Sequence, residues 1–283
     1  MYILAIETTG ARASAAVAGQ GGLMREAIAD GTLNHLQTVV PLVSDLLEKC
    51  QLTIDDITAI AVSEGPGSFT GIRIGVSTAR ALAQAAHRPL IGVPTLHTFA
   101  YQLADLQREK RGRGAGAAGG EGPGGEAAEE AAEIACPIFD ARRSQVYGGA
   151  CRLTAGDEIE ELVTGGAYAL EEYLALLAKA CQGRLLRPVF FGDGIRAYEQ
   201  QVLQWAGEFG LAADLAPEGF RLQRAASAAQ LALALYRKGR CVSYEEMHPN
   251  YMRMAEAQRR LEEGTLPQAD QTRAARGREG KRG

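Results

Sequence analysis

The pattern of apolar and polar residues at the start of the chain predicts an antiparallel β-hairpin. Two short apolar runs, residues 2–6 and 14–18, are typical of buried strands, and Thr8-Thr9-Gly10 between them is typical of a turn. Because so short a connection cannot form a parallel crossover, the two strands are expected to pair in opposite directions.

An amphipathic helix is predicted over residues 33–50. Asn34 is a suitable N-cap, and Pro41 is expected to kink the helix or to loosen one turn. Apolar residues recur in this segment at the helical intervals of three and four, at Leu36, Val39, Val40, Val43, Leu46, Leu47 and Cys50.

The next segment alternates strand, helix and strand, which predicts an α/β sheet. Residues 59–63 form the first strand, 71–86 the helix and 89–94 the second strand. The helix is rich in Gly, Ala and Ser, and such small residues let a helix pack closely against its neighbours.

The loop that precedes this helix, Glu64-Gly-Pro-Gly-Ser-Phe-Thr-Gly71, has an unusual composition. Its glycines permit positive φ, and Ser68 or Thr70 can cap the helix. The loop has neither the lysine of a Walker A motif nor the spacing of a serine-hydrolase elbow. From its residues alone, a structural turn and a ligand contact remain equally open.

Residues 107–133 differ in composition from the rest of the chain. They contain eight glycines and seven alanines, and no Ile, Leu, Val, Met or aromatic residue. Such a segment buries too little apolar surface to offset its ordering entropy. We therefore expect a flexible insert at 107–133, disordered over 111–125, in which 126–133 could extend a helix.

The pattern of the first 106 residues recurs after the insert. Two strands are predicted at 134–139 and 145–153, on either side of Asp140-Ala-Arg-Arg-Ser144. The repetition suggests two related lobes, 1–106 and 134–263, followed by a disordered basic tail at 264–283. The second lobe is completed by a predicted strand at 188–192 and predicted helices at 169–181, 195–209 and 225–238.

Composition narrows the functional classes. The 283 residues are 46% hydrophobic and 23% charged, and the net charge of -4 argues against a free-standing nucleic-acid binder. The chain starts without the basic region of a signal peptide and has no apolar run long enough to span a bilayer, so a cytoplasmic protein without membrane contact is expected. Five cysteines without Cys-x-x-Cys spacing disfavour disulfides or zinc.

Several motifs occur in a fixed order: Ile3-Leu-Ala-Ile-Glu-Thr-Thr9, Asn34-His-Leu-Gln37, Glu64–Gly75, Phe139-Asp-Ala-Arg-Arg143 with Val146-Tyr147, Gly192-Asp-Gly194 and Pro249-Asn-Tyr-Met-Arg253. Together they resemble the TsaB/YeaZ family from residue 1 to about residue 263. The resemblance implies a two-lobed α/β fold of the acetate/sugar kinase–actin (RNase H-like) type. It also implies a non-catalytic scaffold that binds and activates TsaD, which with TsaE transfers a threonylcarbamoyl group to the adenosine 3′ of certain tRNA anticodons.

In kinase–actin folds, the turn between the first two strands holds phosphates, and Thr8, Thr9 and Gly10 occupy that turn here. An ordinary hairpin turn is the commoner explanation of such residues. Glu7 stands where nucleotide-binding relatives carry a shorter Asp, which disfavours an ATPase. The other weak candidates for nucleotide contact are Asp140, Arg142 and Asp193, each of which could equally form a local turn or ion pair.

Metal-dependent relatives of the TsaD type carry two histidines one helical turn apart. Here His35 is followed four residues later by Val39, and one imidazole cannot replace a multi-ligand site. We therefore expect no metal and no intrinsic cofactor, with ATP or ADP confined to the interface of an assembled complex.

Two functional classes remain. The first is a scaffold that binds TsaD through the two predicted helices, contacts TsaE and reaches tRNA only within the complex. The same surface would form a homodimer when the chain is alone. Its candidate interface residues are His35, Leu36, Val39, Val40, Val43, Phe69, Arg73, Val76 and Arg80. The alternative is a kinase-like ATPase or a metallopeptidase that acts alone.

Overall fold

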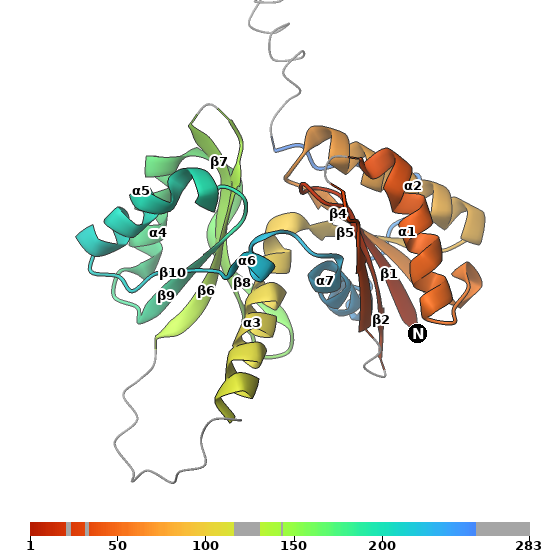
Figure 1. Ribbon diagram of the computed structural model, residues 1–283, viewed down its shortest axis with the longest axis horizontal. Helices are drawn as coiled ribbons and strands as arrows, with labels where there is room; N and C mark the ends of the chain where they lie inside the picture. Colours follow the sequence, from red (N-terminus) through yellow and green to blue (C-terminus); the bar gives the residue numbers. More distant parts are fainter. Residues whose placement is uncertain (21–23, 32–33, 116–130, 143, 253–283) are drawn as a thin grey trace, which may run out of the picture. The chain divides into compact units, whose positions relative to one another are not determined.

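The computed structural model describes residues 1–20, 24–31, 34–115, 131–142 and 144–252. Within these ranges the chain forms two five-stranded sheets with helices packed on their faces (Figure 1). No helix in the described part is long and apolar enough to cross a membrane.

The first sheet has the strand order β3-β2-β1-β4-β5. Strand β1 pairs antiparallel with β2 and parallel with β4, so the predicted hairpin is confirmed. Strand β3 was not predicted, because Arg25 and Glu26 interrupt its apolar pattern. The strands are β1 (Tyr2–Glu7), β2 (Ser14–Gly19), β3 (Met24–Ile28), β4 (Ala59–Gly65) and β5 (Leu90–Pro94).

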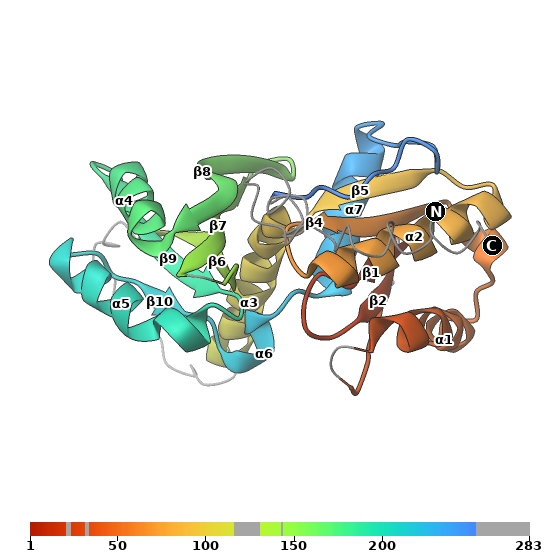
Figure 2. The ribbon, with the colours of Figure 1, turned by 90° about the horizontal axis from the view of Figure 1, so that it is seen from above.

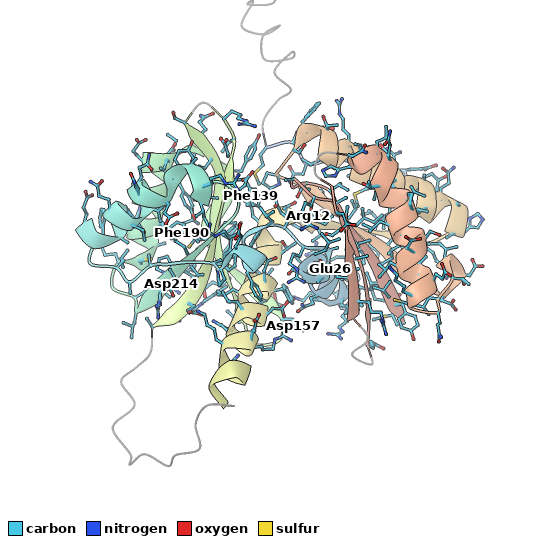
Figure 3. All side chains as sticks on the ribbon, viewed as in Figure 1. Arg12, Glu26, Phe139, Asp157, Phe190 and Asp214 are labelled. Atoms are coloured by element: carbon cyan, nitrogen blue, oxygen red, sulfur yellow. The ribbon has the colours of Figure 1, made fainter. Side chains whose placement is uncertain are left out.

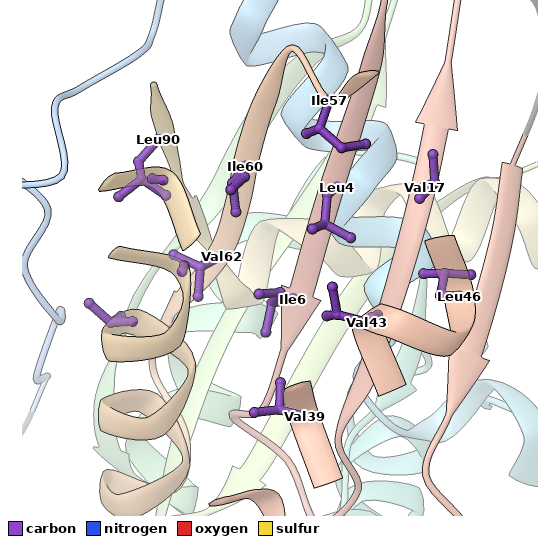
Figure 4. Close-up of a cluster of buried hydrophobic side chains, with 14 of the residues drawn as sticks. Leu4, Ile6, Val17, Val39, Val43, Leu46, Ile57, Ile60, Val62 and Leu90 are labelled. Atoms are coloured by element: carbon purple, nitrogen blue, oxygen red, sulfur yellow. The ribbon is translucent and has the colours of Figure 1, made fainter. Parts of the chain in front are cut away.

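Alternate residues of β1 face two different helical layers. Leu4 and Ile6 belong to the apolar cluster beneath α1 (His35–Lys49) and α2 (Phe69–Ala86), as Figure 4 shows. Ile3 and Ala5 belong to the cluster beneath α7 (Ala225–Arg237) on the other face. The period of two in a strand therefore accounts for both layers of this lobe.

The two predicted helices of this lobe are present, with small differences at their ends. Helix α1 continues through Pro41 without interruption, and Asn34 precedes it without forming a side-chain cap. The side-chain Nδ2 of Asn34 instead donates to Gln37 Oε1 at 2.9 Å. Ser68 caps α2 by accepting from the Gly71 amide at 3.2 Å.

The second sheet repeats the topology of the first, which confirms the two related lobes and the predicted fold class. Its order, β10-β9-β6-β7-β8, places an antiparallel β6-β7-β8 meander beside strands that run parallel to β6. Helices α4 (Leu170–Cys181) and α5 (Ile195–Glu208) pack on it (Figure 2). The strands are β6 (Ala132–Asp140), β7 (Gln145–Thr154), β8 (Glu158–Ala169), β9 (Leu186–Phe191) and β10 (Asp214–Leu215).

The structure divides the chain differently from the predicted boundaries. Helix α3 (Thr98–Ala115) runs into the predicted flexible insert, and β6 begins at Ala132. The possible helical extension over 126–133 is therefore wrong at 131–133, and the rest of it lies outside the described residues. Helix α7, assigned by its position in the sequence to the second lobe, packs on β1 and β2 of the first sheet. Residues 116–130 and 253–283, which include the predicted tail, lie outside the described residues.

Contacts between the two lobes are apolar at α3 and ionic at the β7–β8 turn. Phe99 of α3 packs against Phe139 and Phe191 of the second sheet, with ring centroids 5.6 and 5.4 Å apart. Asp157, labelled in Figure 3, pairs with Arg237 of α7 at 3.6 Å.

The described residues also include three short segments: the 3-10 turns at Ile54–Asp56 and Thr95–His97, and α6 (Glu218–Arg221).

Candidate functional site

The turn after β1 is bonded to its own carboxylate. Glu7 Oε1 accepts from the Thr9 amide at 2.5 Å and from the Thr9 hydroxyl at 2.6 Å, and the Gly10 amide also contributes to this carboxylate. Glu7, Thr8 and Thr9 are all buried. Burial raises the pKa of Glu7, whereas the hydrogen bonds from Thr9 oppose that rise.

The glycine-rich loop covers the same turn from the other side. The Ser68 amide donates to the Thr9 carbonyl at 2.7 Å, and the Thr8 hydroxyl donates to the Gly71 carbonyl at 2.8 Å. A Cβ on Gly67 would lie 2.5 Å from the Thr9 carbonyl oxygen. A Cβ on Gly71 would overlap the Thr8 carbonyl oxygen. The glycines therefore allow two backbones to touch, which supports the structural interpretation of the loop.

The hydrogen-bond donors of this turn are already engaged within the protein. The Thr9 amide and hydroxyl, which would bind phosphate in a kinase-like turn, are directed at Glu7 instead. An ionised Glu7 would also repel a phosphate placed at this turn. Among the described residues, no group of three or more His, Cys, Asp or Glu side chains is placed to hold a metal ion.

The second group of candidate residues forms a local network at the β6–β7 turn. The structure brings Asp140, Arg142 and Asp193 together: the Asp140 amide donates to Asp193 Oδ1 at 3.1 Å, and the Arg142 amide donates to Asp140 Oδ1 at 2.7 Å. Arg142 Nη1 also lies 3.3 Å from Asp140 Oδ2, although its side chain is 86% exposed. These carboxylates therefore stabilise the turn, in which Arg142 has a φ of 65°.

Four of the predicted interface residues lie in the core, and burial removes them from any partner surface. Val39, Val43 and Val76 are 1%, 4% and 2% exposed and pack in the cluster under α1 and α2. His35 is also buried, where its Nε2 lies 2.9 Å from the Gly10 carbonyl oxygen. These positions were misassigned because α1 is apolar on more than one face, and periodicity does not show which face meets the sheet.

The other face of α1 is apolar and open to solvent. Leu36 and Val40, one helical turn apart, are 74% and 52% exposed. Leu36 is the most exposed large hydrophobic residue in the described part of the chain. Two such side chains in one row are unusual on a surface that stays in water and are typical of an interaction site.

The first turns of α2 carry an aromatic and cationic group. The Arg73 guanidinium carbon lies 4.0 Å from the centroid of the Phe69 ring, within cation–π range. Arg73 Nε donates to the Tyr251 hydroxyl at 2.9 Å, and Arg80 Nε donates to the Tyr244 carbonyl at 2.7 Å. Sequence reasoning did not place the two tyrosines at this site, although Tyr251 belongs to the Pro249-Asn-Tyr-Met-Arg253 motif.

Known proteins are similar to this chain over nearly its whole length and, separately, over the residues that include α1 and α2. The family model for TsaD, the tRNA N6-adenosine threonylcarbamoyltransferase, matches residues 17–110. The tRNA threonylcarbamoyladenosine biosynthesis protein TsaB of Bacillus subtilis is 29% identical over 259 residues, which cover 91% of this chain and 96% of the relative. TsaB of Escherichia coli is 40% identical over 109 residues, covering 35% of this chain and 43% of the relative.

A solved structure shows the same fold. YeaZ from Pseudomonas aeruginosa superposes with a TM-score of 0.65 at 24% identity, over 88% of this chain and 99% of that one. The agreement extends over both lobes, because nearly the whole of that chain is covered.

Proposed function

Because the chain belongs to the TsaB (YeaZ-like) family of tRNA threonylcarbamoyladenosine biosynthesis proteins, we propose that it is the non-catalytic subunit that binds and activates a TsaD-type threonylcarbamoyltransferase. The transferase would modify the adenosine 3′ of tRNA anticodons, and this chain would reach tRNA only within the complex. A TsaE-type protein would be a further partner.

The observation that carries this proposal is the exposed row of Leu36 and Val40 on α1. Fully burying one such side chain against a partner contributes roughly 1.5–3 kcal/mol, so both together can supply a large part of the binding free energy. The surface continues onto α2, because the two helices pack side by side on one face of the first sheet. An enzyme that acts alone has no need of this surface.

A second observation supports a TsaD-type partner. The match to the TsaD family model covers residues 17–110, which include both α1 and α2. A TsaD-type protein therefore carries related helices, and two related surfaces can pair about a pseudo-two-fold axis. The same geometry lets two copies of this chain form a homodimer when the partner is absent.

The proposal of a non-catalytic role rests on the β1–β2 turn, where Glu7 takes the donors that a nucleotide phosphate would need. ATP or ADP, where it takes part, would bind in the partner or at the interface of the assembled complex. The alternatives of an ATPase or a metallopeptidase that acts alone gain no support from the described residues.

The experiment combines a binding assay with reconstituted tRNA modification. Leu36→Glu and Val40→Glu should each weaken binding to the TsaD-type partner about 10- to 100-fold, since a charge would be buried in the interface. Leu203→Glu is the matched control, because Leu203 is 45% exposed on α5 of the other lobe. Omitting the chain should abolish product. Undiminished binding by both α1 variants, or modification by this chain alone, would refute the proposal.

A further inference from the structure

The segment after α7 forms a strap that returns to the first lobe. The C-terminal strap comprises residues 241–252, and near its start the amide and carbonyl of Val242 both bond to Leu90 of β5 at 2.9 Å. Met247 is 3% exposed and belongs to the cluster under α1 and α2. The Asn250 amide donates to the Glu64 carbonyl at 2.8 Å, which fixes the end of the strap on the glycine-rich loop.

This path carries Tyr251 onto the first turns of α2. The ring centroids of Tyr251 and Phe69 lie 4.9 Å apart. The guanidinium carbon of Arg73 lies 4.0 Å from the Phe69 centroid and 5.8 Å from the Tyr251 centroid. The Tyr251 hydroxyl accepts the Arg73 Nε proton at 2.9 Å. These three residues form a clamp, in which two rings and one hydrogen bond hold an exposed arginine.

The clamp leaves the outer edge of the guanidinium available. Only Nε is bonded to Tyr251, and no carboxylate among the described residues pairs with Arg73. The two terminal nitrogens of an arginine present parallel N–H groups whose geometry matches a carboxylate. An arginine held in one orientation also loses less conformational entropy on binding than a free one.

The clamp lies at the same end of the α1–α2 layer as Leu36. His35 at the start of α1 contacts Gly10, and Gly71 in the first turn of α2 contacts Thr8, so both helices begin at the β1–β2 turn. Leu36 and Arg73 thus stand at neighbouring helix ends. The strap runs along β5, whereas α1 packs on β2 and β3, so a partner would have to extend from Leu36 and Val40 across α2 to reach Arg73.

We propose that Tyr251 is a positioning residue, which holds Arg73 ready to bind a carboxylate of the docked TsaD-type partner. The strap thereby becomes part of the docking surface, although it lies far from α1 and α2 in the sequence. This inference rests on the proposed function and specifies one polar contact of that interface.

The test uses the full chain and its TsaD-type partner in a surface-based binding assay, at about 50 and about 200 mM salt. Arg73→Lys keeps the charge but loses the planar fork, and should weaken binding about tenfold. Arg73→Gln should also reduce the salt dependence of the affinity. Tyr251→Phe keeps the ring and loses the hydroxyl, so a loss of about threefold is expected. Arg196→Lys, at an exposed arginine of α5, is the control.

A double variant separates positioning from local stability. If Tyr251 acts through Arg73, then Arg73→Gln combined with Tyr251→Phe should bind no worse than Arg73→Gln alone. If Leu36→Glu weakens binding but every clamp variant binds as tightly as the wild type, this inference is overturned and the proposed function stays intact. A lower Tm for Tyr251→Phe with unchanged affinity would likewise overturn it. Absence of wild-type binding would refute both.

Discussion

Replacing Gly71 by alanine tests whether the glycine-rich loop serves close backbone contact. Gly71 lies in the first turn of α2, where a Cβ would overlap the Thr8 carbonyl oxygen. The neighbouring atoms belong to the backbone of a buried turn, so they cannot rotate away as a flexible side chain would. The substitution must therefore push α2 from the turn or distort the turn itself.

The expected magnitude combines three contributions. Overpacking in a buried site costs about 1–3 kcal/mol. The hydrogen bond from the Thr8 hydroxyl to the Gly71 carbonyl, 2.8 Å long, contributes about 1 kcal/mol that the displacement would weaken or lose. The higher helix propensity of alanine returns about 1 kcal/mol. We expect Gly71→Ala to lower the free energy of unfolding by about 1–3 kcal/mol.

Gly207→Ala in α5 is the matched control, because no atom lies within 4 Å of a Cβ at that position. This substitution should raise the free energy of unfolding by up to about 1 kcal/mol through helix propensity alone. Urea unfolding followed by circular dichroism measures both values. Two substitutions with the same sign and size would show that the loop glycines have no packing role, and would refute the reasoning. Partner binding should fall for Gly71→Ala only, because α2 begins at this loop.

Two further predictions concern carboxylates that are buried or partly buried. Burial raises the pKa of Glu7, so the Glu7 carboxyl loses its proton at lower pH in the unfolded chain than in the folded one. The free energy of unfolding therefore falls as pH rises from the ordinary pKa of a glutamate towards the raised pKa of Glu7. Glu7→Gln should flatten this dependence in urea titrations from about pH 4 to about pH 8, and an unchanged slope would contradict it. Glu26, labelled in Figure 3, accepts from Arg224 and from the Ala226 amide at 3.0 Å. Glu26→Ala should lower the free energy of unfolding by about 2 kcal/mol. Glu158→Ala breaks the exposed pair with Lys238 and should lower it by less than about 1 kcal/mol. Equal losses for the two variants would refute this prediction.

Local chemistry allowed much of the fold to be predicted from the sequence. Apolar runs located β1 and β2, helical periodicity located α1, and the repeated pattern after residue 134 indicated the second lobe. Ser68 was one of two predicted caps for α2, the other being Thr70, because capping depends on residues only three positions apart. Such features involve neighbours along the chain, so the order of residues carries the information directly.

Tertiary structure alone decided how these elements form a site. Helix α1 is apolar on two faces, and only its packing on the sheet shows that Val39 is buried while Leu36 is exposed. Arg73 and Tyr251 are 178 positions apart, and a hydrogen bond over that separation leaves no local pattern in the sequence. From its position Glu7 was expected only to disfavour an ATPase, and the folded turn shows that it takes the donors of Thr9. These properties depend on which distant backbones meet, a result of packing that periodicity and propensity do not specify.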